Sequence, residues 1–234
     1  MKTYYSNINN FKDSTQEMEG SSFEDRYASY LELISNSKKE RILSFKKEDD
    51  RLRSLAGIIL LTDIIKNIQK EYINTPLYKK ASDIAFPLNI EYEEFGKPYI
   101  VGFSELVFSI SHSGLYAAVA IADTSECCKI GVDIQAKDRT NISKIATRFY
   151  TDIEKNIIDG ANESSKKEDY FYKIWSAKEA FMKCDGKGLS YGLTNFNADI
   201  TNNIVTDQSG KCLATLKEQE CPEGYACYVC TIND

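Results

Sequence analysis

Two oxygen-bearing side chains lie two residues apart in the apolar segment Ile130-Gly-Val-Asp-Ile-Gln135. Residues two apart in a strand point to the same face of a sheet, so Asp133 and Gln135 are predicted to lie side by side. Carboxylate and amide oxygens are the ligands that a hard cation such as Mg²⁺ requires. Since a carboxylate in an apolar strand is costly unless paired, the alternative is that Asp133 caps or bridges within the sheet.

The segment Phe108-Ser-Ile-Ser-His-Ser-Gly114 gathers hydroxyl groups around His112, the only histidine of the chain. Ser111, His112 and Ser113 place several hydrogen-bond donors where a strand meets a turn, which favours a phosphate-binding site. A hydrolase triad is disfavoured, because adjacent side chains on one strand point to opposite faces. The alternative for His112 is a structural role at the strand end.

A third segment, Trp175-Ser-Ala-Lys-Glu-Ala-Phe-Met-Lys183, has helical spacing. Trp175, Glu179 and Lys183 are each four residues apart and therefore share one helix face. The simple interpretation is a surface ion pair between Glu179 and Lys183, which stabilises a helix by only a few tenths of a kcal/mol. Lys178 and Glu179 also lie within an apolar stripe, however, and this placement indicates a site that holds phosphate and metal.

A fourth segment, Glu94-Phe-Gly-Lys-Pro98, has the glycine and proline that are typical of a turn. It holds Lys97 at a bend of the chain. On its own this lysine is interpreted as a solvated turn residue.

The elements that would position these groups follow the order helix then strands, twice. Helices are expected at 24–34, after the charge-dense stretch 38–53 to about residue 74, at 142–158, and around 170–184 after a polar loop at 160–167. The long helix is indicated by one apolar stripe, Ile58, Leu61, Ile65, Ile68 and Tyr72, with Pro76 just beyond its end. Strands are expected at 107–111, 116–122 and 129–135, within the polar N-terminal segment, and across 193–232. The pattern predicts an α+β fold of two halves that meet near residue 128.

Composition narrows the function class. The chain has 234 residues and a formal net charge of −6, which disfavours nucleic acid and anionic membranes as partners. The first twenty residues lack the apolar core of a signal peptide, and the longest apolar run, around 57–61, is too short to span a bilayer. A cytoplasmic protein is the expectation.

Seven cysteines raise the question of a metal site. Cys227 and Cys230 have zinc-like spacing, with Cys212 and Cys221 upstream. Residues three apart in a strand point to opposite faces, however, and 225–232 reads as a strand without the glycine or proline of a metal-binding turn. The favoured interpretation is reduced cysteines that fill the core.

Taken together, FGKP (95–98), FSISHSG (108–114), IGVDIQ (130–135) and FYKIWSAKEAFMKCDGKGLS (171–190) resemble the Sfp-type 4′-phosphopantetheinyl transferases in order and approximate spacing. RFYTDIEKNII (148–158) resembles the helix that precedes the family's WxxKE segment, which is residues 175–179 here. The resemblance covers about residues 24–200.

This resemblance implies an enzyme that transfers 4′-phosphopantetheine from coenzyme A to a serine of an acyl or peptidyl carrier protein. Mg²⁺ would assist, with Mn²⁺ as a substitute, and adenosine 3′,5′-bisphosphate would be released. The implied fold is two similar α+β halves related by a pseudo-twofold axis, 1–128 and 129–234, in a monomer. Each half is expected to be a small antiparallel sheet with a long helix, and coenzyme A is expected between them.

The resemblance also implies roles for individual residues. The expected metal ligands are Asp133, Gln135 and Glu179. The expected catalytic residues are Glu179 as base, directly or through a metal-bound water, Lys183 and Glu154. The expected coenzyme A contacts are Lys38, Arg41, Ser54, Lys97, Ser111, His112, Asp133, Lys178 and Lys183. Gln135 stands where the family has an acid, so weaker metal binding or a water-mediated contact is expected. The alternatives are a non-catalytic relative that binds coenzyme A or a carrier, and an unrelated Mg²⁺-dependent phosphotransferase.

Overall fold

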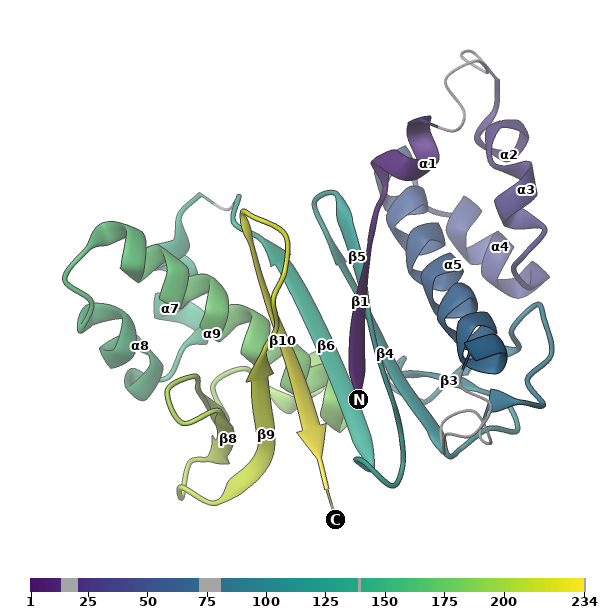
Figure 1. Cartoon of the computed structure of the whole chain (residues 1–234). Coiled ribbons are helices and arrows are strands. Elements are labelled where there is room, and N and C mark those ends of the chain that lie inside the picture. Colours follow the sequence, from purple (N-terminus) through teal and green to yellow (C-terminus); the bar gives the residue numbers. More distant parts are fainter. Residues whose placement is uncertain (14–20, 72–80, 139, 234) are drawn as a thin grey trace.

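The structure, a computed structural model, describes residues 1–13, 21–71, 81–138 and 140–233. Its elements in the first half are β1 (Lys2–Asn7), α1 (Asn9–Asp13), α2 (Phe23–Arg26), α3 (Ala28–Leu31), α4 (Asn36–Leu43), α5 (Glu48–Glu71), β2 (Ile90–Tyr92), β3 (Pro98–Ile100), β4 (Leu106–Ser113) and β5 (Tyr116–Asp123). Those in the second half are β6 (Lys129–Ala136), α7 (Ile142–Phe149), α8 (Asp152–Asp159), α9 (Ser164–Asp185), a 3₁₀ turn (Gly188–Tyr191), β7 (Phe196–Asp199), β8 (Ile204–Asp207), β9 (Cys212–Glu218) and β10 (Tyr225–Ile232). The predicted α+β fold is confirmed, and Figure 1 shows the central strands flanked by α5 on one side and α9 on the other.

The first half packs α5 on a three-stranded antiparallel sheet with the order β1-β5-β4. The predicted apolar stripe of this helix is buried in the core, at Ile58, Leu61, Ile65 and Ile68. Tyr72 and Pro76, which complete the predicted pattern, lie outside the described residues. The N-terminal segment provides the edge strand β1, as predicted.

The second half packs α9 on a five-stranded antiparallel sheet with the order β6-β10-β9-β8-β7. Its core holds Phe171, Ile174, Trp175, Phe181 and Met182 of the predicted stripe. The helix begins earlier than predicted, at Ser164, so part of the expected 160–167 loop is its first turn.

The predicted helix at 142–158 is two helices, because a capping box interrupts it. The Thr151 hydroxyl accepts a hydrogen bond from the Glu154 backbone N–H at 3.4 Å, and the Glu154 carboxylate accepts one from the Thr151 N–H at 2.9 Å. This reciprocal pair satisfies the first amides of a new helix and so starts α8 after the break.

The two halves meet along an apolar layer between their sheets. Ala118, Ala120 and Ala122 project from β5 toward a buried group on β6 and β10 formed by Ile130, Val132, Ile134, Cys227 and Val229. Alanines on this face of β5 leave room for the larger side chains opposite. The assignment of 1–128 and 129–234 as separate units stays a prediction, and this shared layer shows that the halves are tightly joined.

Polar contacts join the same two halves where β4 lies beside β6. The hydroxyls of Ser109, Ser111 and Ser113 accept hydrogen bonds from the backbone N–H groups of 132, 134 and 136 at 3.0, 3.3 and 3.0 Å. The partners advance by two residues on both strands, so β4 and β6 run in the same direction. We call these three hydroxyls the serine ladder.

Helix α9 approaches β6 unusually closely at Gly131. A Cβ atom on this residue would lie 2.1 Å from the Ala180 carbonyl oxygen and 2.4 Å from the Cys184 backbone nitrogen. The Ser176 hydroxyl also donates to the Asp133 carbonyl oxygen at 2.8 Å, which ties the helix to the strand. The glycine of the IGVDIQ segment thus permits the contact that brings α9 against Asp133.

We expect Gly131→Ala to lower the free energy of unfolding by about 3 kcal/mol or more, because the added methyl group meets backbone atoms that cannot rotate away. Denaturant unfolding followed by circular dichroism measures this change. Gly160→Ala is the control, since its Cβ would lie 3.2 Å from the nearest atom, and its effect should stay below about 1 kcal/mol. Equal effects of the two variants would contradict the proposed close approach.

Candidate functional site

Three of the four sequence segments meet in a cavity of about 360 Å³ at the junction of the two halves. β4 contributes Ser111 and His112, and β6 contributes Asp133 and Gln135. Helix α9 lines the other side with Trp175, Glu179 and Lys183, the three residues predicted to share a helix face. The structure thus brings Asp133, Gln135 and Glu179 to one place, as the predicted metal-ligand set requires.

A triangle of hydrogen bonds lies at the bottom of this cavity. The Ser111 hydroxyl donates to Asp133 Oδ1 at 2.8 Å, and Lys183 Nζ donates to the Ser111 hydroxyl at 2.7 Å and to Asp133 Oδ1 at 2.8 Å. Ser111 and Asp133 are buried, and Lys183 is half-buried. The alternative role of Asp133, a bridge within the protein, therefore applies to Oδ1, which bonds to both Ser111 and Lys183.

The second oxygen of Asp133 has a different environment. Oδ2 is buried and has no hydrogen-bond partner among the described residues. A buried carboxylate oxygen without a partner is costly, and a cation would relieve that cost. Together with the side chains of Gln135 and Glu179, Asp133 offers the oxygen donor set of a hard divalent cation, so the residues fit Mg²⁺ or Mn²⁺.

Gln135 is held by its amide nitrogen. Nε2 donates to the Ser113 hydroxyl at 3.1 Å and to the Ala136 carbonyl oxygen at 3.1 Å. The carbonyl oxygen is then the atom that this side chain can offer to a cation. The serine ladder therefore positions both β6 residues of the donor set, Asp133 through Ser111 and Gln135 through Ser113.

The fourth segment reaches the same region through Lys97. Its ammonium group donates to the Cys184 carbonyl oxygen near the C-terminal end of α9 at 2.7 Å, so this lysine crosses from one half to the other. Burial lowers the pKa of Lys97. A second cavity, of about 180 Å³, contains Lys97 and shares Lys183 and Ile110 with the first.

Lys38 and Arg41 lie in a separate depression of about 370 Å³ on α4 and β2. Lys38 Nζ donates to the Tyr92 hydroxyl at 2.7 Å, and the Arg41 guanidinium lies 4.5 Å from the Tyr92 ring centroid. A larger cavity, of about 650 Å³, is lined by both Tyr92 and Lys97. Each of these depressions therefore shares a lining residue with the next: Tyr92, then Lys97, then Lys183. Together they form a continuous series from Arg41 in the first half to α9 in the second.

The turn after β4 is held from both halves of the molecule. Arg53 of α5 donates to the Gly114 carbonyl oxygen at 3.0 Å, and the Tyr225 hydroxyl of β10 accepts a hydrogen bond from the Leu115 N–H at 2.9 Å. Arg53 was not predicted as a site residue. Its neighbour Ser54, which was, is half-buried on the same helix.

His112 lies beside this turn, and the residue is exposed. Desolvation of the imidazole by the surrounding protein, together with the positive charges of Lys183 and Arg53, lowers the pKa of His112 to about 4, even though the residue as a whole is exposed to solvent. Arg53 therefore adds a cation beside the predicted phosphate contact. The only sequence signal for it was its place at the end of the charge-dense stretch.

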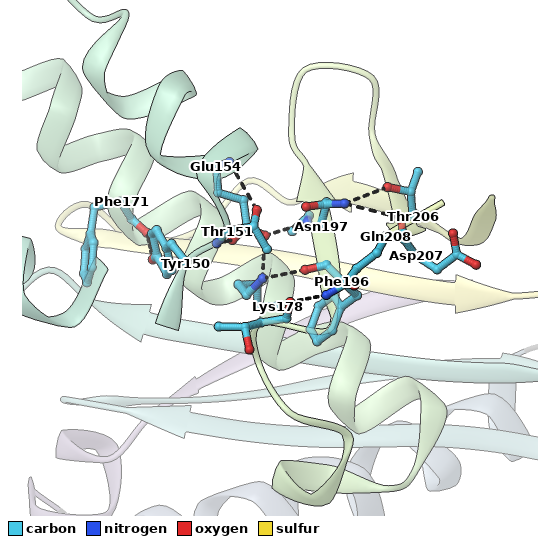
Figure 2. Close-up of polar contacts among 12 residues, drawn as sticks. Tyr150, Thr151, Glu154, Phe171, Lys178, Phe196, Asn197, Thr206, Asp207 and Gln208 are labelled. Atoms are coloured by element: carbon cyan, nitrogen blue, oxygen red, sulfur yellow. Dashed lines mark hydrogen bonds and ion pairs between the residues drawn. The ribbon is translucent and has the colours of Figure 1, made fainter. Parts of the chain in front are cut away.

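The structure places Glu154 and Lys178 away from the cavity. Both side chains are completely buried in the second half, where Lys178 Nζ forms an ion pair with Glu154 Oε1, as Figure 2 shows. Glu154 also accepts hydrogen bonds from the Ala198 and Thr151 N–H groups at 2.7 and 2.9 Å, and Lys178 donates to the Phe196 carbonyl oxygen at 3.0 Å. Neither side chain can touch a substrate in this arrangement, so the expected catalytic and coenzyme A roles do not fit it.

The cysteines give no shared metal site on β10. Cys227 belongs to the apolar layer between the sheets, whereas Cys230 lies in the core under α9. The two thiols thus face opposite sides of the sheet, as the strand periodicity predicts, and cannot ligate one ion. Both are buried among hydrophobic side chains.

Comparison with known proteins agrees with this arrangement. A family model described as 4′-phosphopantetheinyl transferase, N-terminal, matches residues 21–124, and the model of the 4′-phosphopantetheinyl transferase superfamily matches residues 129–230. The 4′-phosphopantetheinyl transferase Sfp of Bacillus subtilis (strain 168) is 31% identical over 209 residues, which cover 87% of this chain and 84% of that protein. This chain belongs to the 4′-phosphopantetheinyl transferase superfamily.

Two further proteins are similar to this chain. A 4′-phosphopantetheinyl transferase of Bacillus subtilis is 32% identical over 173 residues, with 74% of this chain and 69% of that protein covered. A solved holo-(acyl-carrier-protein) synthase from Bacillus anthracis is 21% identical and covers 45% of this chain and 96% of its own, with a TM-score of 0.34. The predicted resemblance to Sfp-type transferases and the predicted enzyme class are confirmed by the sequence relatives. Within the described part of the chain, no helix is both long and apolar enough to cross a membrane.

We expect Lys178→Met to lower the free energy of unfolding by about 3–5 kcal/mol, because it leaves the buried Glu154 carboxylate without its counter-ion. Chemical denaturation measures the loss. The control is Lys173→Met on the same helix, whose partially exposed ion pairs with Asp169 and Glu218 should contribute less than about 1 kcal/mol. A stable Lys178→Met protein with weakened coenzyme A binding would instead place Lys178 at the substrate.

Proposed function

We propose that this transferase uses Mg²⁺ to move 4′-phosphopantetheine from coenzyme A to a serine hydroxyl of an acyl or peptidyl carrier protein. The product beside the loaded carrier is adenosine 3′,5′-bisphosphate. The observation that carries the proposal is the buried Asp133 carboxylate, whose Oδ2 has no partner among the described residues. Glu179 and Lys183 line the same cavity, so an acid, a base and a cation converge there.

Glu179 is the proposed base. A serine hydroxyl is not ionised at neutral pH, and it needs a base to become a nucleophile. Glu179 lies on the cavity face of α9, half-buried and one helical turn from Lys183. It would take the proton of the incoming hydroxyl as the oxygen attacks the phosphorus that carries pantetheine.

The same attack breaks the bond between that phosphorus and the oxygen bridging the diphosphate, and negative charge develops on the leaving group. Mg²⁺ bound by Asp133, Gln135 and Glu179 would neutralise part of the diphosphate charge. The Lys183 ammonium, already beside Asp133, would contribute a fixed positive charge to the same group. Lys97, in the adjoining cavity, is the proposed cation for the nucleotide end of coenzyme A.

The nucleotide end of coenzyme A carries a further phosphate, and cations of the first half would bind it. His112 and Arg53 lie together at the end of β4, with Ser54 next in the chain. Lys38 and Arg41 border the outer depression at Tyr92. Charge-assisted hydrogen bonds from Arg53 and a protonated His112 suit a phosphate with more than one negative charge. Lys38 and Arg41 lie in their separate depression, so their expected contact with the same phosphate stays a prediction.

Gln135 sets the charge of the proposed metal site. An amide in place of a carboxylate leaves two acids, Asp133 and Glu179, beside the positive charge of Lys183. Such a site attracts a divalent cation less strongly than a three-acid site does. We therefore propose that the cation binds mainly together with the diphosphate of coenzyme A, which supplies further oxygens.

The decisive experiment incubates the enzyme with coenzyme A, Mg²⁺ and a panel of apo carrier proteins, and measures the intact carrier mass. We expect one phosphopantetheine to be added to one serine, and no addition after chelation of divalent cations. Glu179→Gln should slow transfer by about 10²-fold or more, because it removes the base. Glu168→Gln, an exposed glutamate on α9, is the matched control and should be fully active. Binding of coenzyme A without any mass shift would indicate a non-catalytic relative.

A separate prediction concerns His112, whose proton signals are simple to assign because it is the only histidine. In the free enzyme its pKa should be about 4 by nuclear magnetic resonance titration. Bound coenzyme A should raise that pKa, since a phosphate favours the charged imidazolium, so affinity should increase as pH falls toward that value. Dephospho-coenzyme A, which lacks the 3′-phosphate, should raise it less. The same pKa with and without coenzyme A would place the phosphate elsewhere.

A further inference from the structure

The Ser111 hydroxyl uses its full hydrogen-bonding capacity inside the protein. A hydroxyl has one donor hydrogen and two acceptor lone pairs. Ser111 donates to Asp133 Oδ1 and accepts from Lys183 Nζ and from the Ile134 N–H. With the side chain buried at 4% exposure, no hydrogen-bonding position remains for a phosphate oxygen unless one of these bonds breaks.

The contacts of Ser111 decide which oxygen of Asp133 remains for a ligand. Ser111 and Lys183 both bond to Oδ1, at 2.8 Å each, and Oδ2 is left without a partner among the described residues. Without the hydroxyl, the carboxylate could rotate and present both oxygens to the Lys183 ammonium. An ammonium at that position would then compete with a metal cation for the carboxylate.

The rest of the serine ladder shows that this role belongs to Ser111. Ser109 accepts from the Val132 N–H in the same way, yet the structure gives it no contact with Asp133. Ser113 accepts from the Ala136 N–H and from the amide of Gln135. Joining β4 to β6 is therefore a property of all three hydroxyls, whereas only Ser111 touches the carboxylate.

We propose that Ser111 is a positioning residue that holds the Asp133 carboxylate with Oδ2 directed to a divalent cation, rather than a contact to the coenzyme phosphate. The inference rests on the proposed metal-dependent function and deepens it. It links the two halves at the reaction centre, because a side chain of β4 orients a metal ligand of β6.

The test measures cation binding and coenzyme binding separately. Mn²⁺ affinity is read from the electron paramagnetic resonance signal of free Mn²⁺ in the presence of coenzyme A, and coenzyme A affinity is measured by calorimetry without divalent cations. Ser111→Ala should weaken Mn²⁺ binding by roughly 10–100-fold, the range seen when a partner of a metal ligand is removed. Coenzyme A affinity without the cation should change by less than about twofold, since no bond to the coenzyme is lost.

Ser109→Ala is the matched control, because it removes one ladder bond and leaves Asp133 untouched; Mn²⁺ affinity should stay at the wild-type value. Ser111→Thr keeps a hydroxyl and should restore most of the Mn²⁺ affinity, which also covers the case in which Ser111→Ala fails to fold.

The proposal is overturned if Ser111→Ala loses coenzyme A affinity without cations and keeps Mn²⁺ binding. It is also overturned if Ser109→Ala weakens Mn²⁺ binding equally. Failure of the wild-type enzyme to bind Mn²⁺ would overturn the metal-dependent function itself.

Discussion

Between β4 and β6, serine hydroxyls rather than backbone carbonyl oxygens accept the hydrogen bonds of the β6 amides. The cavity around Asp133 depends on this arrangement. In an ordinary sheet the amides of β6 would bond to carbonyl oxygens of a neighbouring strand. Here the amides of 132, 134 and 136 bond to the three serines of the ladder. The sheets of the two halves can therefore meet without merging into one, and the cavity with Asp133 lies along their junction. Helix α9 completes that cavity only because Gly131 lets its backbone approach.

Much of this arrangement could be predicted from periodicity. The strands at β4, β5 and β6, the stripes of α5 and α9, and the shared face of Glu179 and Lys183 all follow from spacing, because local geometry fixes which residues share a face. The grouping of Asp133, Gln135 and Glu179 rested on a family resemblance. All three residues line one cavity, and their role as metal ligands stays a prediction.

Other features depend on tertiary contacts that spacing does not encode. Lys178 and Glu179 are neighbours in one apolar stripe, and only the packing of α8 and β7 shows that Lys178 turns to Glu154 in the core. Arg53 is the last residue of the charge-dense stretch 38–53, and nothing in the local sequence distinguishes it from the other charged residues there. The break before α8 was missed because the capping residues, Thr151 and Glu154, lie within a continuous helical pattern.

The adjacency of Lys178 and Glu179 constrains how α9 can vary in length. Consecutive residues of a helix are separated by a rotation of about 100°, so Lys178 can point into the core while Glu179 faces the cavity. Inserting or deleting one residue before this pair would turn both side chains by that angle and move the carboxylate away from Asp133. Insertions and deletions should therefore be tolerated in surface loops, for example the one that contains Gly210, where a Cβ would meet no neighbouring atom. Within α9 they should not be tolerated.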